Sequence, residues 1–200
     1  LQDVIDWMEA CIHERIPRRI SVINANKLWQ MKQDPRLEII VSKSDLVIPE
    51  WAVYWGAAQL GTPLKSAVYG ITLLKACLSW AEKKGYRLFF LGARPVTVEA
   101  LLSRLSQDYP GLQIAGAHHG YLKSAEDKEN VRQMIRLSMA DVLFVAMGSP
   151  KQEFWIAENQ DQLNVPVSIG VGGSFDVIAG LKKDTPNWAR GHGIEWLYRL

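Results

Sequence analysis

Cysteine is scarce in this sequence, and the two present, Cys11 and Cys77, lie far apart along the chain. Each falls within an apolar helical pattern, which predicts reduced core residues in a cytosolic protein. A disulfide between them is the alternative. No spacing of His, Cys and Asp matches a zinc site, so we expect no metal ion.

An excess of charge of one sign is also missing. The formal net charge is +2 over 200 residues, and acids and bases are interspersed. This balance indicates no nucleic-acid partner. The longest weakly charged region, residues 46–64, contains Glu50, two prolines and two glycines. We therefore expect no transmembrane helix, which needs about 20 apolar residues in a row.

Apolar residues, by contrast, make up 48% of the chain, which is typical of a globular protein with a substantial core. The length favours one domain over residues 1–200. The first turn carries acids and no basic region, so a signal peptide is not expected. Of eight tryptophans, we expect Trp51, Trp55 and Trp80 in the core. Trp188 and Trp196, near the end, suit an interface with a membrane or a partner.

Strand and helix patterns alternate over most of the chain. Such alternation predicts an α/β fold, a Rossmann-like and mainly parallel sheet with helices on both faces. Strands are expected at residues 20–23, 45–48, 86–91, 112–115, 142–146 and 165–171. Helices are expected at residues 3–14, 24–33, 51–60, 70–84, 96–107, 124–138, 151–158 and 194–200, with a helix or turn over 172–180.

Glycines stand where several predicted strands end, among them Gly92, Gly148, Gly172 and Gly173. In parallel sheets, ligands bind at the carboxyl ends of the strands. Glycine allows close approach of the backbone, and the helix that follows presents free N–H groups to an anion. This layout predicts a site for a phosphate-bearing ligand.

The stretch "GSPKQEFW" follows the predicted strand 142–146. Lys151 is suited to neutralise a phosphate, and Gln152 to bind a sugar hydroxyl or a uracil edge. Glu153 is suited to accept hydrogen bonds from ribose hydroxyls. The alternative is a capped surface helix whose Lys and Glu face solvent.

The stretch "GVGGSFDVIAG" does not complete the dinucleotide fingerprint, because Phe175 stands where a glycine is required, and it lacks a P-loop ending. Asp176 is a candidate to orient a ribose or a backbone amide, or simply to cap a helix. In "GAHHGY", His118 and His119 are candidates for a base or phosphate contact, or for structural hydrogen bonds. Tyr121 is a candidate to stack on a nucleobase.

Together "HHGY", "VLFVAMGSPKQEFW", "GVGGSFDVIAG" and the terminal "GIEWLYRL" resemble the WecG/TagA/CpsF family of bacterial glycosyltransferases, from about Asn24 to the last residue. The resemblance implies transfer of an N-acetylhexosamine, hexose or uronic acid from a UDP-sugar to a polyprenyl-diphosphate-linked acceptor, with inversion. It implies no cofactor besides the donor. It also implies cell-wall or exopolysaccharide synthesis by a cytoplasmic enzyme, peripheral at the inner membrane face.

Two departures from the family pattern affect the expected site. Glu50 stands where the family usually has an aspartate proposed as the catalytic base, so the resemblance makes Glu50 the candidate base; a helix cap is the alternative. Ala67 replaces a usual arginine, and Lys65 is the nearby candidate to contact the donor diphosphate. Asn24 is retained from an upstream family motif and is a second candidate catalytic residue.

Family members usually continue past "EWLYRL" with a short appendage that contacts the membrane, and they form homo-oligomers. We therefore expect that this chain lacks a C-terminal membrane-associating segment and associates with itself. Two alternatives stay open. One is a UDP-sugar-binding relative with little or no transferase activity. The other is a nicotinamide-dependent oxidoreductase, which the incomplete fingerprint disfavours.

Overall fold

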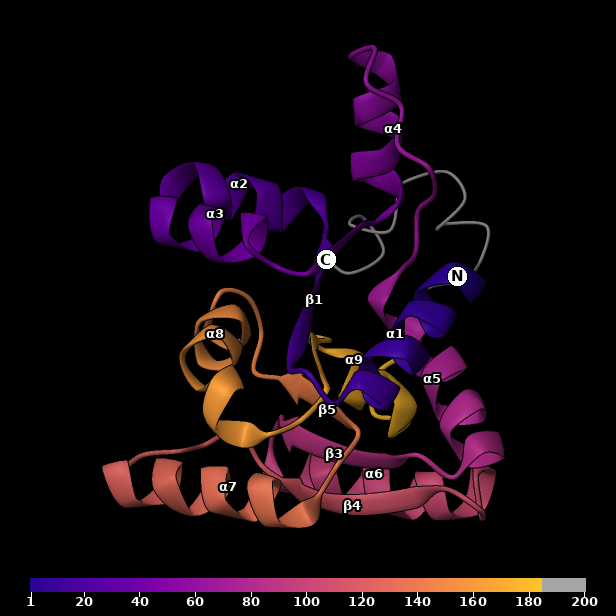
Figure 1. Cartoon of the computed structure of the whole chain (residues 1–200), viewed down its shortest axis with the longest axis vertical. Helices are drawn as coiled ribbons and strands as arrows, with labels where there is room; N and C mark the ends of the chain where they lie inside the picture. The colour runs from indigo at the N-terminus through magenta and orange to yellow at the C-terminus, as the bar shows by residue number, and fades with distance from the viewer. Residues whose placement is uncertain (185–200) are drawn as a thin grey trace.

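The structure, a computed structural model, describes residues 1–184 and contains one six-stranded sheet in the order β2-β1-β6-β5-β3-β4 (Figure 1). Every pair of neighbouring strands is parallel, which confirms the predicted parallel α/β fold. The strands are β1 (Arg18–Ile23), β2 (Leu46–Pro49), β3 (Arg87–Gly92), β4 (Gln113–His118), β5 (Val142–Ala146) and β6 (Val167–Gly170).

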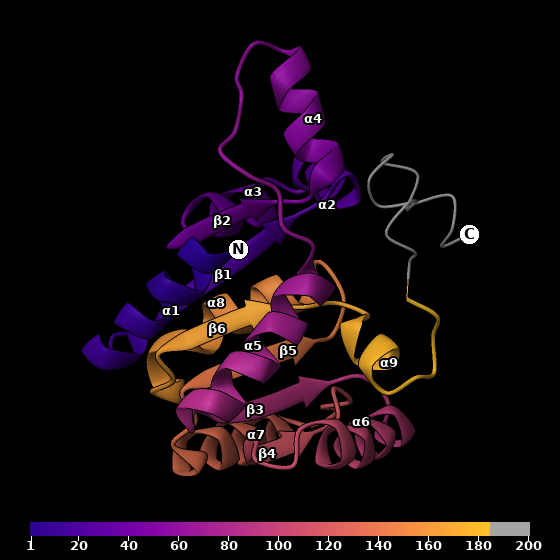
Figure 2. The same cartoon turned by 90° about the vertical axis from the view of Figure 1, so that its right-hand side faces the viewer.

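Helices cover both faces of the sheet (Figures 1 and 2). The helices are α1 (Gln2–Glu14), α2 (Ala25–Gln33), α3 (Pro35–Ser42), α4 (Trp51–Gln59), α5 (Gly70–Lys84), α6 (Pro95–Asp108), α7 (Ala125–Ser138), α8 (Lys151–Leu163) and α9 (Ser174–Ile178). One apolar cluster joins α1, α5, α6 and α9 to one face of the sheet, and another joins α7 and α8 to the opposite face. The short α3 packs beside α8.

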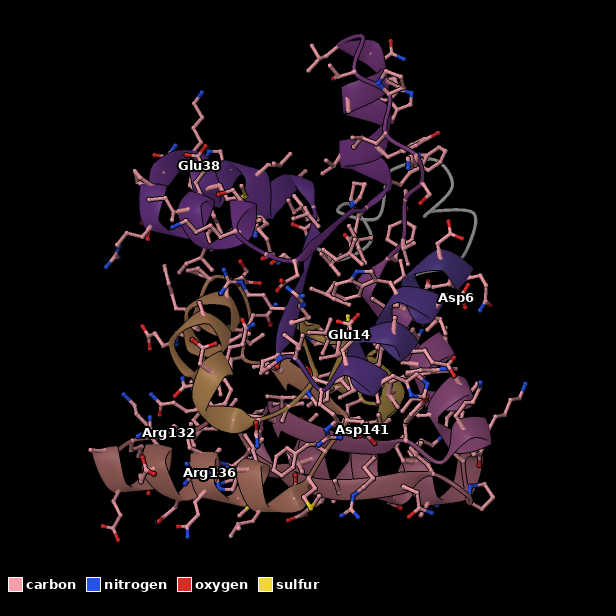
Figure 3. All side chains as sticks on the ribbon, viewed as in Figure 1. Asp6, Glu14, Glu38, Arg132, Arg136 and Asp141 are labelled. Atoms are coloured by element: carbon pink, nitrogen blue, oxygen red, sulfur yellow. The ribbon has the colours of Figure 1, made fainter. Side chains whose placement is uncertain are left out.

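Burial explains the composition of the central strands. Every residue of β5 is buried, since its two faces meet different helices, and a strand buried on both faces is continuously apolar. At its start Asp141 accepts hydrogen bonds from Arg15 Nη1 at 2.9 Å and from the backbone N of Arg87 at 2.8 Å. Asp141 thus ties α1 and β3 to this edge of the sheet, and it lies beside them in Figure 3.

Most expected elements are present within a few residues of their predicted ends, but the sequence patterns did not predict α3. Its start is locally encoded, because the Asp34 side chain accepts a hydrogen bond from the backbone N of Arg36 and Pro35 occupies the first turn. Leu37 and Val41, one turn apart, are its buried residues. Eight residues with two buried positions form too short a periodic pattern to detect.

The tryptophan prediction is wrong for Trp55, which is 57% exposed. Trp51 is half-buried and stacks against Tyr54, with ring centroids 5.5 Å apart. Trp80 is partly buried against the main core cluster, as expected. Trp188, Trp196 and the predicted helix 194–200 lie outside the described residues.

Both cysteines are free and buried, which confirms their prediction as core residues. Burial raises the pKa of both thiols, most strongly for Cys77, whose Sγ lies 3.8 Å from Met8 Sδ. Within residues 1–184, no helix is both long and apolar enough to cross a bilayer. The same residues contain no group of three His, Cys, Asp or Glu that could hold a metal ion.

The sheet has a switch point between β1 and β6. The chain leaving β1 passes through α2 and α3 on the face that carries α8, whereas the chain leaving β6 enters α9 on the opposite face. Adjacent strands whose connections depart to opposite faces leave a crevice at their carboxyl ends. This crevice is where the fold places a ligand site.

Candidate active site

A cavity of about 800 Å³ lies at the carboxyl ends of β1, β2, β5 and β6. Its lining comes from the strand ends and from the helices that follow them. The lining residues are Val22, Asn24, Asn26, Lys27, Glu50, Gly70, Ile71, Gly148, Ser149, Gln152, Gly170, Val171, Gly172, Gly173, Ser174, Val177, Lys182, Lys183 and Asp184. This volume is in the range of about 300–1,000 Å³ typical of small-molecule sites.

Besides α4, whose N-cap is Glu50, three helices of eight residues or more begin at this cavity. Asn24 precedes α2, Gly70 begins α5, and Gly148 and Ser149 precede α8. A helix N-terminus carries unpaired N–H groups and a partial positive charge. Their convergence makes the cavity favourable for an anion such as a phosphate.

A buried chain of polar contacts joins three walls of the cavity. Lys27 Nζ donates to the carbonyl of Val22 at 2.7 Å and to Glu153 Oε1 at 2.6 Å. Gln152 Nε2 donates to the same carboxylate oxygen at 2.9 Å, while Gln152 Oε1 accepts from the backbone N of Gly172 at 3.0 Å. We call Lys27, Glu153 and Gln152 the buried network. It ties α2 to α8 and α8 to the β6–α9 loop.

Burial makes this network costly to disrupt. Lys27, Gln152 and Glu153 expose 4%, 3% and 5% of their surfaces. A buried charge is tolerated when an opposite charge and hydrogen bonds compensate for the lost water. Each group here depends on the others, so the network acts as one rigid support for the cavity wall.

Glycines at the cavity serve two different purposes. A Cβ added at Gly170 would lie 2.6 Å from Gln152 Nε2, so glycine is required for that side chain to pack against β6. Gly148 and Gly172 have φ values of 77° and 53°, in the region that favours glycine. A Cβ at Gly148, Gly172 or Gly173 would meet nothing within 4 Å. These three positions therefore leave open space for a ligand close to the backbone.

Glu50 lies at the N-cap position of α4 but makes no side-chain hydrogen bond to that helix. Its Oε1 instead accepts from the backbone N of Gly70, the first residue of α5, at 3.2 Å. Glu50 thus occupies the N-cap position of α4, as the alternative of a helix cap predicts, while its side chain bonds to α5. Its predicted catalytic role stays a prediction. The carboxylate lines the cavity and bridges the starts of two helices.

Asn24 also lines the cavity, and it is the N-cap of α2. Its Oδ1 accepts a hydrogen bond from the backbone N of Lys27 at 2.9 Å, as its sequence position predicts. The cap orients the first turn of α2, and with it the lysine that enters the buried network. Its predicted catalytic role stays a prediction.

Of the predicted ligand contacts, Gly148, Gln152, Gly172 and Gly173 line the cavity together with Glu50 and Asn24. Lys151 is exposed and does not line the cavity, although it is adjacent to Gln152 in sequence. Glu153 is also absent from the lining, because its carboxylate is turned inward to Lys27. The first turn of α8 thus sends one of three neighbouring polar residues to the cavity.

The other predicted contacts do not line the cavity. A Cβ at Gly92 would lie 2.5 Å from the carbonyl of Ala146, so the close approach of β3 to β5 requires glycine there. The Asp176 carboxylate accepts from Thr97 Oγ1 at 3.0 Å and so binds α9 to α6. Lys65 is exposed and does not line the cavity.

His118 is the last residue of β4 and His119 follows it, and neither lines the cavity. A ring nitrogen of His118, Nδ1, lies 2.7 Å from the carbonyl of His119, and His119 Nδ1 accepts from the backbone N of Tyr121 at 3.4 Å. These contacts agree with the structural alternative for the pair. Tyr121 is 53% exposed and packs against the ring of His119 rather than against the cavity.

Sequence analysis missed Lys27 and the two rim lysines, Lys182 and Lys183. In α2 the burial pattern is the reverse of the usual one: charged Lys27 is buried, while apolar Leu28 and Trp29 are 41% and 64% exposed. A lysine is buried in this way only when a group of opposite charge is buried beside it. That partner, Glu153, lies 126 residues further along the chain.

Comparison with known proteins agrees with these features. The model of the glycosyl transferase WecG/TagA/CpsF family matches residues 1–200. Three relatives bear the name N-acetylglucosaminyldiphosphoundecaprenol N-acetyl-beta-D-mannosaminyltransferase. The protein from Bacillus spizizenii is 36% identical over 86% of this chain, and that from Bacillus subtilis strain 168 is 33% identical over all of it.

The Staphylococcus aureus protein is 41% identical over 82% of this chain. The matched regions span 66%, 78% and 63% of the Bacillus spizizenii, Bacillus subtilis and Staphylococcus aureus proteins. The resemblance stated from the motifs is thereby confirmed. The chain belongs to the glycosyl transferase WecG/TagA/CpsF family.

Proposed function

We propose that this chain is an inverting glycosyltransferase that moves a sugar from a UDP donor to a polyprenyl-diphosphate-linked sugar. The observation that carries the proposal is the position of Glu50, whose carboxylate lines the same cavity as three converging helix N-termini. The N-termini suit a donor diphosphate, and the carboxylate suits an acceptor hydroxyl. The acceptor class is supported by the names of the relatives, because these names specify an undecaprenol-diphosphate-linked sugar as the acceptor.

The reaction needs little chemistry from the protein beyond positioning and charge. Glu50 accepts the proton of the acceptor hydroxyl, and that oxygen forms a bond to the anomeric carbon of the donor. The bond from this carbon to the UDP oxygen breaks on the opposite side, so the configuration inverts. UDP leaves with the electron pair, and its added negative charge is stabilised by helix N-termini and by Lys182 and Lys183 at the rim.

One observation favours the second candidate, a UDP-sugar-binding relative with little transferase activity. Ala67 cannot replace the expected arginine, and exposed Lys65 does not line the cavity. The cavity therefore lacks a bidentate cation among the residues described. Turnover, rather than binding, distinguishes the two candidates.

The test compares Glu50→Gln with a matched control, Glu158→Gln, which changes an exposed carboxylate of α8 that does not line the cavity. Glutamine retains an oxygen to accept from Gly70, so the local fold is kept, but it cannot take a proton. We expect kcat to fall by about 10²- to 10⁴-fold in Glu50→Gln and to stay unchanged in the control.

Calorimetric titration with UDP, several UDP-sugars and NAD, without added metal, completes the test. We expect a UDP-sugar to bind both variants as it binds the unchanged protein, and NAD not to bind. Equal turnover in Glu50→Gln and in the unchanged protein would contradict the assignment of the base. Binding of UDP-sugar without any transfer would favour the second candidate.

A further inference from the structure

Helix α4 stands apart from the other helices of residues 1–184, because it alone has no buried residue. Residues 51–64, which comprise α4 and the following turn, contain no Asp, Glu, Lys or Arg. Trp55 is 57% exposed, and Leu60, at the C-cap, is 84% exposed. A helix this apolar normally lies in a protein core or in a membrane. Within residues 1–184, α4 contacts a core cluster through Val53 and contributes no buried residue to any core cluster.

The helix projects from the body of the molecule in two perpendicular views (Figures 1 and 2). Its base is attached near the sheet, where Val53 packs against a small cluster of Ile23, Leu37 and Val41. The remainder of the helix and the turn at its tip extend away from the sheet. An apolar rod anchored at one end has the shape of an insertion element.

The apolar side chains of α4 surround the helix instead of forming one face. Successive residues are rotated by about 100°. Trp51, Val53, Tyr54, Trp55 and Leu60 therefore point to all sides, and Figure 3 shows side chains on both edges of the ribbon. A second copy of the chain would cover one face and leave the others in water. A lipid environment covers all faces at once.

Part of the backbone at the tip finds hydrogen-bond donors within the turn, which lowers the cost of placing this end of α4 in lipid. The backbone N of Gly61 donates to the carbonyl of Ala58 at 3.2 Å. The backbone N and the Oγ1 of Thr62 donate to the carbonyl of Ala57 at 3.0 and 3.2 Å. Carbonyls at the end of a helix usually bind water or a cap. Here the turn supplies donors to the carbonyls of Ala57 and Ala58.

We propose that residues 51–62 form a membrane-docking element that inserts into one leaflet of a lipid bilayer. Nine helical residues are about 13 Å long, close to half of a hydrocarbon core of about 30 Å. Trp51 and Tyr54, near the base, suit the level of the headgroups, where amphipathic aromatic rings concentrate. The exposed Lys65 beyond the turn adds a charge that anionic lipids attract.

Insertion of α4 would also set the position of the cavity relative to the membrane surface. Because Glu50 immediately precedes α4 and lines the cavity, a buried α4 holds this carboxylate at the level of the headgroups. A lipid-linked diphosphate lies at that same level. This consequence for catalysis rests on the proposed function, whereas the membrane contact itself does not.

Site-specific labelling tests the contact directly. Because Cys11 and Cys77 are buried, an environment-sensitive fluorophore attached to Leu60→Cys reports on the tip of α4. The matched control is Leu137→Cys on α7, a position that is 72% exposed. With vesicles of phosphatidylglycerol and phosphatidylcholine, we expect a blue shift and brighter emission at position 60 and no change at position 137. No response at position 60 would overturn the proposal.

Vesicle flotation measures how much the side chains of α4 contribute to membrane binding. We expect the double variant Trp55→Glu, Leu60→Glu to bind vesicles at least about tenfold more weakly than the unchanged chain, and Leu137→Glu to bind equally. Unchanged binding by the double variant would overturn the proposal. Sedimentation velocity tests the alternative that a second copy of the chain covers α4. If the unchanged chain is a dimer, and the double variant is a monomer that still binds vesicles, then α4 serves self-association instead.

Transfer assays separate this inference from the proposed function. We expect the double variant to keep turnover on a short-chain acceptor and to lose it on a long-chain acceptor embedded in vesicles. If the unchanged chain binds vesicles through α4 but transfers to neither acceptor, the proposed function fails and the docking element stands. If it transfers to both, and the double variant does so equally, the docking element fails.

Discussion

The two sides of the cavity are built in different ways. On the side of β6 and α8, Lys27, Gln152 and Glu153 are buried and bound to one another. On the side of β2, Glu50 leads into α4, a helix with no buried residue. Local stability follows buried contacts and protected hydrogen bonds. The first side, which we call the fixed wall, is therefore rigid. The second side has fewer buried contacts, so its conformation changes more easily when a partner binds.

The largest expected effect comes from breaking the fixed wall. Lys27→Met leaves the Glu153 carboxylate buried without its counter-charge, and we expect the free energy of unfolding to fall by about 3–5 kcal/mol. Urea denaturation measures the change. The double variant Lys27→Met, Glu153→Leu should recover much of the loss, because neither charge then remains.

An exposed ion pair provides the control for this prediction. Lys84 Nζ lies 2.7 Å from Glu9 Oε1, and Lys84 is 51% exposed. Lys84→Met should change stability far less than Lys27→Met, since water screens an exposed pair. Equal losses in the two variants would mean that burial does not govern the network.

A smaller effect distinguishes two glycines of the same wall. Gly170→Ala forces Gln152 away from β6, and we expect a loss of about 1–3 kcal/mol in thermal or urea denaturation. Gly173→Ala adds a methyl group where nothing lies within 4 Å, so stability should be unchanged. Binding of a UDP-sugar, measured by calorimetry, should instead weaken in Gly173→Ala. The reverse pattern would show that Gln152 can move and that the space at Gly173 is not used.

The smallest effects are expected on α4. Trp55→Ala should alter the free energy of unfolding by less than about 0.5 kcal/mol, although a large side chain is removed, because that side chain is already exposed. Val53→Ala should cost more, about 1 kcal/mol, since Val53 packs against the cluster around Leu37. Denaturation of both variants without lipid measures the difference. A loss above 2 kcal/mol for Trp55→Ala would show that α4 is covered in solution.

Much of the fold could be predicted because its determinants are local. Apolar runs such as Val142–Ala146 identify strands, and the capping box of Ser124 and Asp127 marks the start of α7. Glycines at strand ends identified the edge of the sheet at which the cavity lies. Gly148, Gly172 and Gly173 line the cavity there.

The direction of individual polar side chains could not be predicted. Lys151, Gln152 and Glu153 are adjacent in sequence, yet they face solvent, cavity and interior. Which of them turns inward depends on Lys27, which arrives from a distant helix. Gly92 misled in a similar way, because a glycine required by the backbone of Ala146 looks the same in sequence as one required by a ligand.

The hydrogen bond from Gly70 to Glu50 has a mechanical consequence. It ties the carboxylate at the root of α4 to the first residue of α5, a helix packed firmly in the core. Because Glu50 directly precedes α4, a tilt of this helix would displace the Glu50 carboxylate. The hydrogen bond to Gly70 opposes that displacement, since α5 is fixed by its packing in the core.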